Sequence, residues 1–145
     1  MKNNSYNLYH DFVIKSSPSK VFDSIVKPEN LINWWPQKCN GEPKHGAIYR
    51  LYFSSQYDWL AEVVGFELKK SFYLKMIKAD TDWMPTTFGF DLKEENGNTL
   101  VQFFHKGWPK LNHHFRKANW HWALLLKALK DYVEEETIIP FEHRA

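Results

Sequence analysis

The feature that most constrains this chain is a long stretch near its C-terminus, residues 112–136, which contains neither glycine nor proline. Apolar side chains recur there at the three- and four-residue spacing of one helix face, and most charged side chains lie off that face. A helix of about 24 residues is roughly 36 Å long, enough to cross a whole small domain. The rest of the chain must therefore cover its apolar side. The apolar positions are Phe115, Ala118, Trp122, Leu125, Leu126, Leu129, Tyr132 and Val133.

The segments before this helix are predicted to form a sheet. Their side chains alternate between two faces, as they do in strands. The connections are short, and the Asn96-Gly97 pair is typical of a tight hairpin, so neighbouring strands should pair antiparallel. The predicted strands are residues 7–15, 47–53, 57–66, 72–78, 86–92 and 99–105.

Two short helices are predicted after the first strand. Ser17-Pro18 supplies a helix N-cap and a proline for the first helical position, and Pro28 and Pro36 bound the second helix. Residues 1–136 are thus predicted to be one α+β domain, a curved antiparallel six-stranded sheet wrapped around the long C-terminal helix. Residues 137–145 are expected to be a tail that is loose or folds onto a neighbouring chain.

The face of the sheet toward the long helix is rich in aromatic residues. The chain has 7 Trp, 7 Tyr and 11 Phe, which make up 17% of its residues. Such rings could line an apolar ligand cavity with a few polar groups. They could equally fill the space to native packing density. The candidate ligand-binding residues are Tyr49, Phe53, Tyr57, Trp59, Phe72, Met76, Phe88, Phe90, Phe103, His105 and Trp122.

His105 is the polar member of this set, at the end of the last predicted strand. It could hydrogen-bond a ligand, act as a general acid or base, or be a buried histidine satisfied by its neighbours. Four histidines lie between residues 105 and 121, but their spacing does not bring three ligands together, so no metal site is predicted. No nucleophile elbow, carboxylate pair or phosphate-binding loop is present. We therefore predict no cofactor and do not favour catalysis.

Charge and cysteine content exclude other classes of function. The 19 Lys and Arg against 17 Asp and Glu give a net charge of +2, too small to favour a nucleic-acid partner. No apolar run of transmembrane length and no signal-peptide pattern is present, so membrane insertion is not expected. Cys39 is the only cysteine, which excludes an internal disulfide and suits a cytoplasmic location.

Three tryptophan-containing segments fall on short helices or loops, where we expect exposed aromatic side chains near the mouth of a cavity. They are Trp34-Trp35, Trp83-Met84 and Trp108-Pro109. One residue of each pair is expected to be structural. The other could gate a ligand or form a contact patch for a protein partner or a second copy of the chain.

Three motifs, in this order, resemble the START-like, or SRPBCC, superfamily. The segment SPSKVFDSIVKPENLINWW, residues 17–35, is similar to its opening helices, and GNTLVQFFHKGW, residues 97–108, to its last strand. Trp122, Leu125, Leu129 and Lys130 have the spacing of the helix that follows. The resemblance covers about residues 12–135 and is strongest to the AHSA-type branch, named after the activator of a heat-shock chaperone's ATPase. It implies a helix-grip fold with a cavity between sheet and helix.

The superfamily includes lipid carriers, hormone receptors, cyclases and cochaperone-like domains, so the fold does not by itself define a function. We expect this chain to bind a small hydrophobic or aromatic molecule in that cavity, without cofactor chemistry. One alternative is a protein interaction module of the chaperone-activator kind. A second is a cyclase or dehydratase that uses the same cavity. The sequence departs from the family pattern at His121, where relatives often have glycine.

Overall fold

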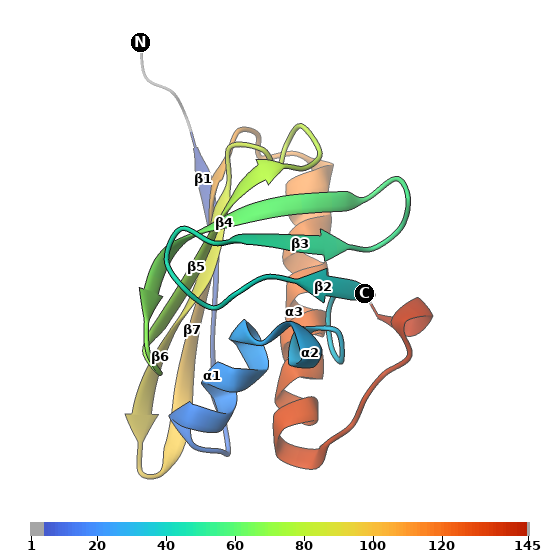
Figure 1. The fold of residues 1–145 in the computed structure, drawn as a ribbon. Coiled ribbons are helices and arrows are strands. Elements are labelled where there is room, and N and C mark those ends of the chain that lie inside the picture. Colours follow the sequence, from blue (N-terminus) through green and yellow to red (C-terminus); the bar gives the residue numbers. More distant parts are fainter. Residues whose placement is uncertain (1–4, 145) are drawn as a thin grey trace.

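The long C-terminal helix is α3, His113–Glu135, in the computed structural model, which describes residues 5–144 of the chain. Its start is capped by Asn112, whose side-chain oxygen accepts a hydrogen bond of 3.0 Å from the Phe115 amide. It ends at Glu136, which has a left-handed backbone conformation with φ 57°. α3 packs against one face of a strongly curved sheet (Figure 1).

The sheet is antiparallel, with strand order β1-β7-β6-β5-β4-β3-β2, so β1 and β2 are its edges. This confirms the predicted α+β helix-grip architecture. The strands are β1 Tyr6–Ile14, β2 Lys38–Asn40, β3 Ile48–Tyr52, β4 Asp58–Glu67, β5 Ser71–Lys78, β6 Thr87–Glu95 and β7 Asn98–Trp108.

The predicted number of six strands is wrong, because β2 adds a seventh. β2 pairs with β3, placing Lys38 opposite Tyr52 and Asn40 opposite Arg50. Three residues are too few to show a two-residue alternation, so nothing local distinguishes this strand from a loop. Only its pairing with β3 defines it.

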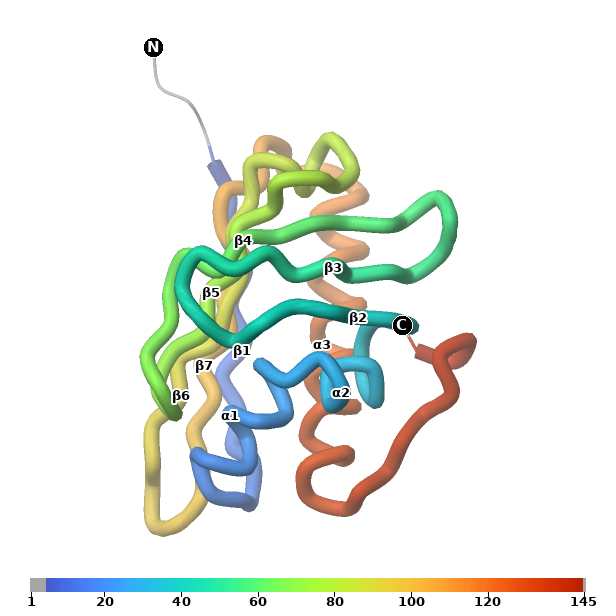
Figure 2. The backbone as a smooth tube through the Cα atoms, in the orientation of Figure 1, coloured from blue at the N-terminus to red at the C-terminus, as the bar shows by residue number. Residues whose placement is uncertain are grey.

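The two short helices are α1, Pro18–Val26, and α2, Pro28–Leu31. The Ser17 hydroxyl caps α1 by accepting a hydrogen bond from the Lys20 amide at 3.3 Å. Both helices lie beside the C-terminal half of α3 (Figure 2). The Tyr132 hydroxyl of α3 accepts a 3.0 Å hydrogen bond from the Asn33 side chain and donates another to Asn30. These bonds anchor the segment around α2 to α3.

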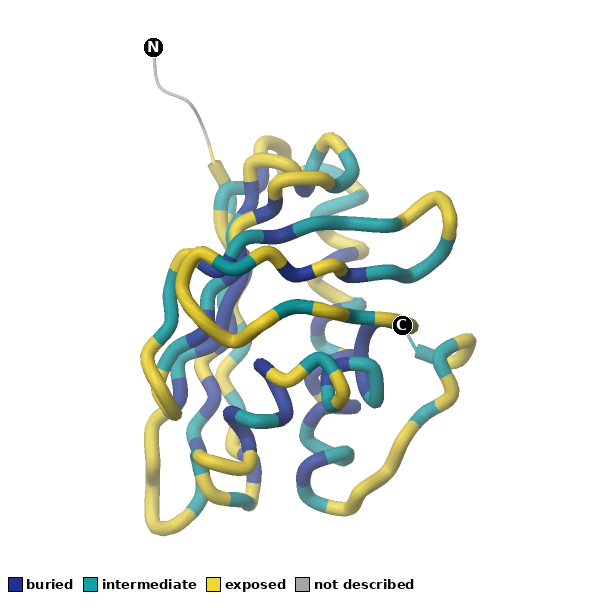
Figure 3. The backbone as a smooth tube through the Cα atoms, viewed as in Figure 1, coloured by how far each residue is buried: buried dark blue, intermediate teal, exposed yellow. Residues whose placement is uncertain are grey.

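Aromatic rings fill the space between the sheet and α3. Cross-strand pairing places Phe88 opposite His105 and Phe90 opposite Phe103, as the alternation predicted. All four side chains are buried. Buried positions run along the inner strands and along the face of α3 toward the sheet (Figure 3). The predicted apolar face of α3 is correct, although Phe115 and Tyr132 are only half-buried.

The described part of the tail, residues 137–144, folds back onto its own chain. It ends in a short 3-10 helix, Phe141–His143. The Arg144 guanidinium donates hydrogen bonds of 2.7 Å to the Ile32 carbonyl and 2.8 Å to the Ile139 carbonyl. Carbonyls past the end of a short helix lack helical partners, and Arg144 satisfies one of them.

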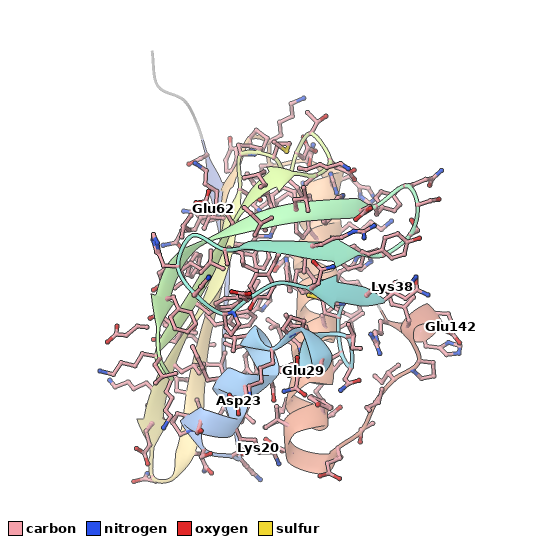
Figure 4. All side chains as sticks on the ribbon, in the orientation of Figure 1. Lys20, Asp23, Glu29, Lys38, Glu62 and Glu142 are labelled. Atoms are coloured by element: carbon pink, nitrogen blue, oxygen red, sulfur yellow. The ribbon has the colours of Figure 1, made fainter. Side chains whose placement is uncertain are left out.

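The charged side chains labelled in Figure 4 lie on α1, α2, β2, β4 and the last 3-10 helix. They are Lys20, Asp23, Glu29, Lys38, Glu62 and Glu142, and none of them lines the aromatic pocket described below. Within residues 5–144, no helix combines the length and apolar character needed to cross a membrane. The cytoplasmic location stays a prediction.

Candidate functional site

A pocket of about 330 Å³ opens between α3 and the sheet, at the end where α3 begins. Its walls come from four places: the segment after α2, the β3–β4 hairpin, the β5–β6 loop and one face of α3. The lining residues are Trp35, Phe53, Tyr57, Trp59, Asp80, Trp83, His114, Lys117, Ala118, His121, Trp122 and Leu125.

The aromatic rings of this pocket contact one another around its wall. The ring centroids of Trp59 and Trp83 are 4.7 Å apart, and those of Trp35 and Trp122 are 5.0 Å apart. Phe53 joins the two pairs, at 5.3 Å from Trp59 and 5.7 Å from Trp35. Tilted and edge-on pairs at these distances are favourable, so the wall is stabilised by its own packing.

Four of the eleven candidate residues line this pocket: Phe53, Tyr57, Trp59 and Trp122. The other seven lie outside its wall, buried in the packed interior. They are Tyr49, Phe72, Met76, Phe88, Phe90, Phe103 and His105. Alternation along a strand identifies which side chains face the helix, but it does not tell filled space from open space.

The tryptophans expected to be exposed near the mouth are buried. Trp34 is 1% exposed, Trp35 5%, Trp83 8% and Trp108 0%. Trp35 and Trp83 are nevertheless pocket-wall residues, so their predicted position near the mouth is correct and their predicted exposure is wrong. Trp83 lies in a loop without periodicity, where sequence patterns carry no information about burial.

The residues predicted from the sequence to bind a ligand include only one from the α3 side of the pocket, Trp122. α3 contributes His114, Lys117, Ala118, His121 and Leu125 in addition to Trp122. Their spacing of three and four residues places them on one helix face. The sequence spacing therefore indicates that these residues share one helix face. The same face also carries apolar residues that fill the core, and only the fold shows where the packed core ends and the pocket begins.

His105 connects two of the pocket tryptophans. The Trp122 indole N–H donates a 3.0 Å hydrogen bond to His105 Nδ1, and His105 Nε2 lies 2.9 Å from the Thr86 hydroxyl oxygen. An indole nitrogen can only donate, so Nδ1 is the acceptor and the imidazole proton is on Nε2. Thr86 then donates to the Trp83 carbonyl at 2.6 Å.

Burial lowers the pKa of His105 to about 3, so the imidazole is neutral near pH 7. Both of its nitrogens are already engaged by Trp122 and Thr86. The sequence left three roles open for His105: a hydrogen-bond partner of a ligand, a general acid or base, or a buried histidine satisfied by its neighbours. These contacts agree with the third role. His105 acts here as a positioning residue for the pocket wall.

The pocket rim carries charged and titratable groups. Asp82 accepts hydrogen bonds from the Asn112 side chain at 3.3 Å and from His114 Nδ1 at 3.1 Å, which lower the pKa of Asp82. Partial burial and the nearby Lys117 ammonium lower the pKa of His121. Asp82 thus ties the β5–β6 loop, which carries Trp83, to the first turn of α3.

Cys39 lies outside this pocket and is not poised as a nucleophile. Burial, together with the Glu29 carboxylate, raises the pKa of its thiol to about 12, so it is protonated near neutral pH. Within residues 5–144, no three His, Cys, Asp or Glu side chains are grouped as metal ligands would be.

Comparison with known proteins identifies the family. Residues 15–134 match the family described as Activator of Hsp90 ATPase homolog 1-like protein, AHSA1. The chain belongs to this family. This confirms the resemblance to the AHSA-type branch of the START-like superfamily. The AHSA1-like fold commonly binds hydrophobic ligands. No curated protein sequence was found to match it.

Solved structures share the fold of the AHSA1-like chain. The Aha1 dimer from Colwellia psychrerythraea is similar with a TM-score of 0.82 and 25% identity, covering 90% of this chain and 97% of that one. Protein SSP2350 from Staphylococcus saprophyticus has a TM-score of 0.79 and 15% identity, covering 93% and 96%. Protein MLL2253 from Mesorhizobium loti has a TM-score of 0.78 and 16% identity, covering 92% and 100%. At these identities the last two indicate the fold alone.

Proposed function

We propose that this AHSA1-like protein binds a small, largely aromatic molecule in the pocket between α3 and the sheet. The observation that carries the proposal is the 330 Å³ volume walled by Trp35, Phe53, Trp59, Trp83 and Trp122. Ligand pockets in proteins are mostly apolar with a few polar groups, and start at roughly 300 Å³. A molecule of one or two fused rings suits this volume.

The hydrogen bonds behind the wall support this proposal. The Trp122 indole is held by His105, and the Trp83 backbone carbonyl is held by Thr86, so one ring and the loop that carries the other are positioned before a ligand arrives. Binding to a preformed wall avoids the entropy cost of ordering its side chains. The wall is therefore suited to a flat, rigid ligand.

A second cleft, of about 480 Å³, lies between α1, the segment after α2 and the C-terminal end of α3. It is larger, but most of its lining is polar, including Lys20, Asp23, Asn30 and Asn33. Its Tyr132 hydroxyl is already hydrogen-bonded to Asn30 and Asn33. We therefore favour the smaller aromatic pocket for an apolar ligand.

We favour binding over the cyclase or dehydratase alternative. His105 has both nitrogens engaged within the interior, and the Cys39 thiol has a raised pKa. Neither side chain lines the pocket. A general base needs a free lone pair within hydrogen-bonding reach of the substrate, and His105 offers none.

The test is native mass spectrometry of the protein purified from its own host, compared with its denatured mass. We expect an added mass that disappears on denaturation. Titration of the unliganded protein with apolar compounds should then raise its melting temperature. Trp59→Ala should weaken this binding, whereas Tyr9→Ala, which changes an exposed aromatic residue on β1, should not. A native mass equal to the denatured mass, with no thermal shift across the compound panel, would count against the proposal.

The interaction-module alternative has one specific observation in its favour. Trp120 is 64% exposed and Leu124 is 42% exposed, and their spacing of four residues places them together on the outer side of α3. We propose that this apolar surface contacts a second copy of the chain. A 25% identical relative is described as a dimer, which supports this choice of partner.

Sedimentation velocity would test the self-association. We expect a concentration-dependent dimer that Trp120→Ser and Leu124→Ser each weaken. Tyr9→Ser is the matched control, because it removes an exposed aromatic side chain from a different surface. A monomer at all accessible concentrations would contradict the dimer without affecting the pocket proposal.

A further inference from the structure

The charged side chains of the pocket lie on one side, where α3 and the β5–β6 loop meet the solvent. α3 contributes His114, Lys117 and His121 to the lining, of which His114 is already bonded to Asp82, and the loop contributes Asp80. The remaining wall is formed almost entirely by aromatic and aliphatic side chains. A ligand that fills the pocket therefore meets charged groups at its rim and rings elsewhere.

Lys117 differs from the other two lysines within α3. Lys127 pairs with Asp131 and Lys130 pairs with Glu134, each four residues further along the helix. The residue four positions after Lys117 is His121, and no ion pair within 4.0 Å links Lys117 to a carboxylate of the described chain. Lys117 therefore lines the pocket with no carboxylate of the described residues within ion-pair distance of its ammonium.

The nearby carboxylates do not supply that partner. Asp82 is engaged by Asn112 and His114. Asp80 lines the same pocket from the loop side, but no ion pair connects it to Lys117. The helix side of the rim is thus the positive side, and the loop side is the negative one.

We propose that the ligand is an aromatic acid, whose ring lies against the tryptophan wall and whose anionic group contacts Lys117 and His121. This inference rests on the proposed function and assigns the charge and orientation of its ligand. An anion can accept hydrogen bonds from the Lys117 ammonium and from a His121 ring N–H. Asp80 repels the anionic group and so directs it toward α3.

Three probes of nearly equal size test the charge: 2-naphthoate, neutral 2-naphthol and cationic 2-naphthylmethylammonium. Isothermal titration calorimetry with the full-length protein should show the tightest binding for 2-naphthoate. We expect it to exceed 2-naphthol by about three- to tenfold, the range for a hydrogen-bonded ion pair at a partly exposed site. This advantage should shrink as salt concentration rises.

Lys117→Met should remove most of the preference for 2-naphthoate and leave 2-naphthol binding within about twofold. Arg116→Met is the matched control, because it removes one positive charge at the adjacent, exposed α3 position that does not line the pocket. It should leave the preference intact. Asp80→Asn should strengthen 2-naphthoate binding and weaken binding of the ammonium probe.

The outcomes separate this inference from the proposal on which it rests. If none of the three probes binds, the proposed pocket function fails. If 2-naphthol binds as tightly as 2-naphthoate and Lys117→Met changes nothing, the pocket binds aromatic molecules but the acid preference is overturned. If the ammonium probe binds most tightly and loses this advantage in Asp80→Asn, the acid preference is overturned in favour of a cationic ligand.

Discussion

The indole N–H of Trp122 donates a 3.0 Å hydrogen bond to Nδ1 of His105, and this bond joins α3 to β7 inside the aromatic interior. Through Thr86 the same histidine also reaches the carbonyl of Trp83 in the β5–β6 loop. One neutral imidazole thus connects helix, sheet and loop directly behind the candidate pocket. The stability of the fold and the shape of the pocket are therefore expected to respond together when His105 is changed.

His105→Leu should lower the free energy of unfolding by about 2 kcal/mol, because it keeps a similar volume but leaves the buried Trp122 N–H without an acceptor. Chemical denaturation would measure the loss. The matched control is His10→Leu on the neighbouring strand β1, since the buried His10 Nε2 has no hydrogen-bond partner among the described residues. That control should change stability by less than about 0.5 kcal/mol or increase it. Equal losses in the two variants would refute the role assigned to His105.

The stability of the protein should fall with acidification between pH 6.5 and 5. His105 has a pKa of about 3 when folded, well below its usual value near 6.5, because burial disfavours the charged imidazole. Between these values the unfolded chain binds a proton that the folded chain does not, so unfolding becomes easier by about 1.4 kcal/mol per pH unit. The contribution is complete above pH 6.5 and is lost progressively as pH falls toward 3.

Denaturation curves at pH 7.5, 6.0 and 5.0 would measure this slope, and His105→Leu should make it shallower. The pKa values of Asp82 and Glu134 are also lowered, and their contributions are present above the usual carboxyl range and disappear below about pH 4.5. The window from pH 5 to 6.5 therefore excludes these carboxylates and leaves His105 and His121, the two histidines with a lowered pKa, and the comparison with His105→Leu separates them. An unchanged slope in His105→Leu would mean that other groups cause the acid sensitivity.

Asp82→Ala should loosen the contact between the β5–β6 loop and the start of α3. The Asp82 carboxylate accepts hydrogen bonds from Asn112, the N-cap of α3, and from His114 in its first turn. A carboxylate near a helix N-terminus also interacts favourably with the helix dipole. We expect a stability loss of about 1 kcal/mol and faster amide hydrogen exchange in the first turn of α3. Thr81→Ala, at the exposed neighbouring position, should show neither change.

Glu134 covers part of the free edge of β1. Its carboxylate accepts hydrogen bonds of 2.7 Å from the Lys15 amide and from Lys130, whose ammonium also donates to the Val13 carbonyl. Burial raises the pKa of Glu134, but these donors more than offset it, so the pKa is lowered overall. Glu134→Ala should therefore cost about 1 to 2 kcal/mol in a denaturation experiment. Glu135→Ala, at the adjacent exposed position, should be nearly neutral, and equal effects of the two would contradict this account.

Local sequence determined the elements whose signals extend over several residues. Apolar spacing predicted α3, and the Ser17 and Asn112 caps mark the starts of their helices in the structure as short-range hydrogen bonds require. Two-residue alternation predicted that Phe88, Phe90, Phe103 and His105 share one face of the sheet. These outcomes depend on residues within a few positions of one another, so a single sequence carries them.

The tertiary structure alone decided what depends on partners far apart in the chain. β2 exists because β3 pairs with it, and Trp35 and Trp83 are buried because other segments cover them. The structural role of His105 depends on its hydrogen bonds to Trp122 of α3 and to Thr86 of the β5–β6 loop, which lie far from it in the sequence. Alternation identified an aromatic inner face, but the volumes of all its side chains together decided where packing ended and a pocket remained, because close packing is a property of the whole interior.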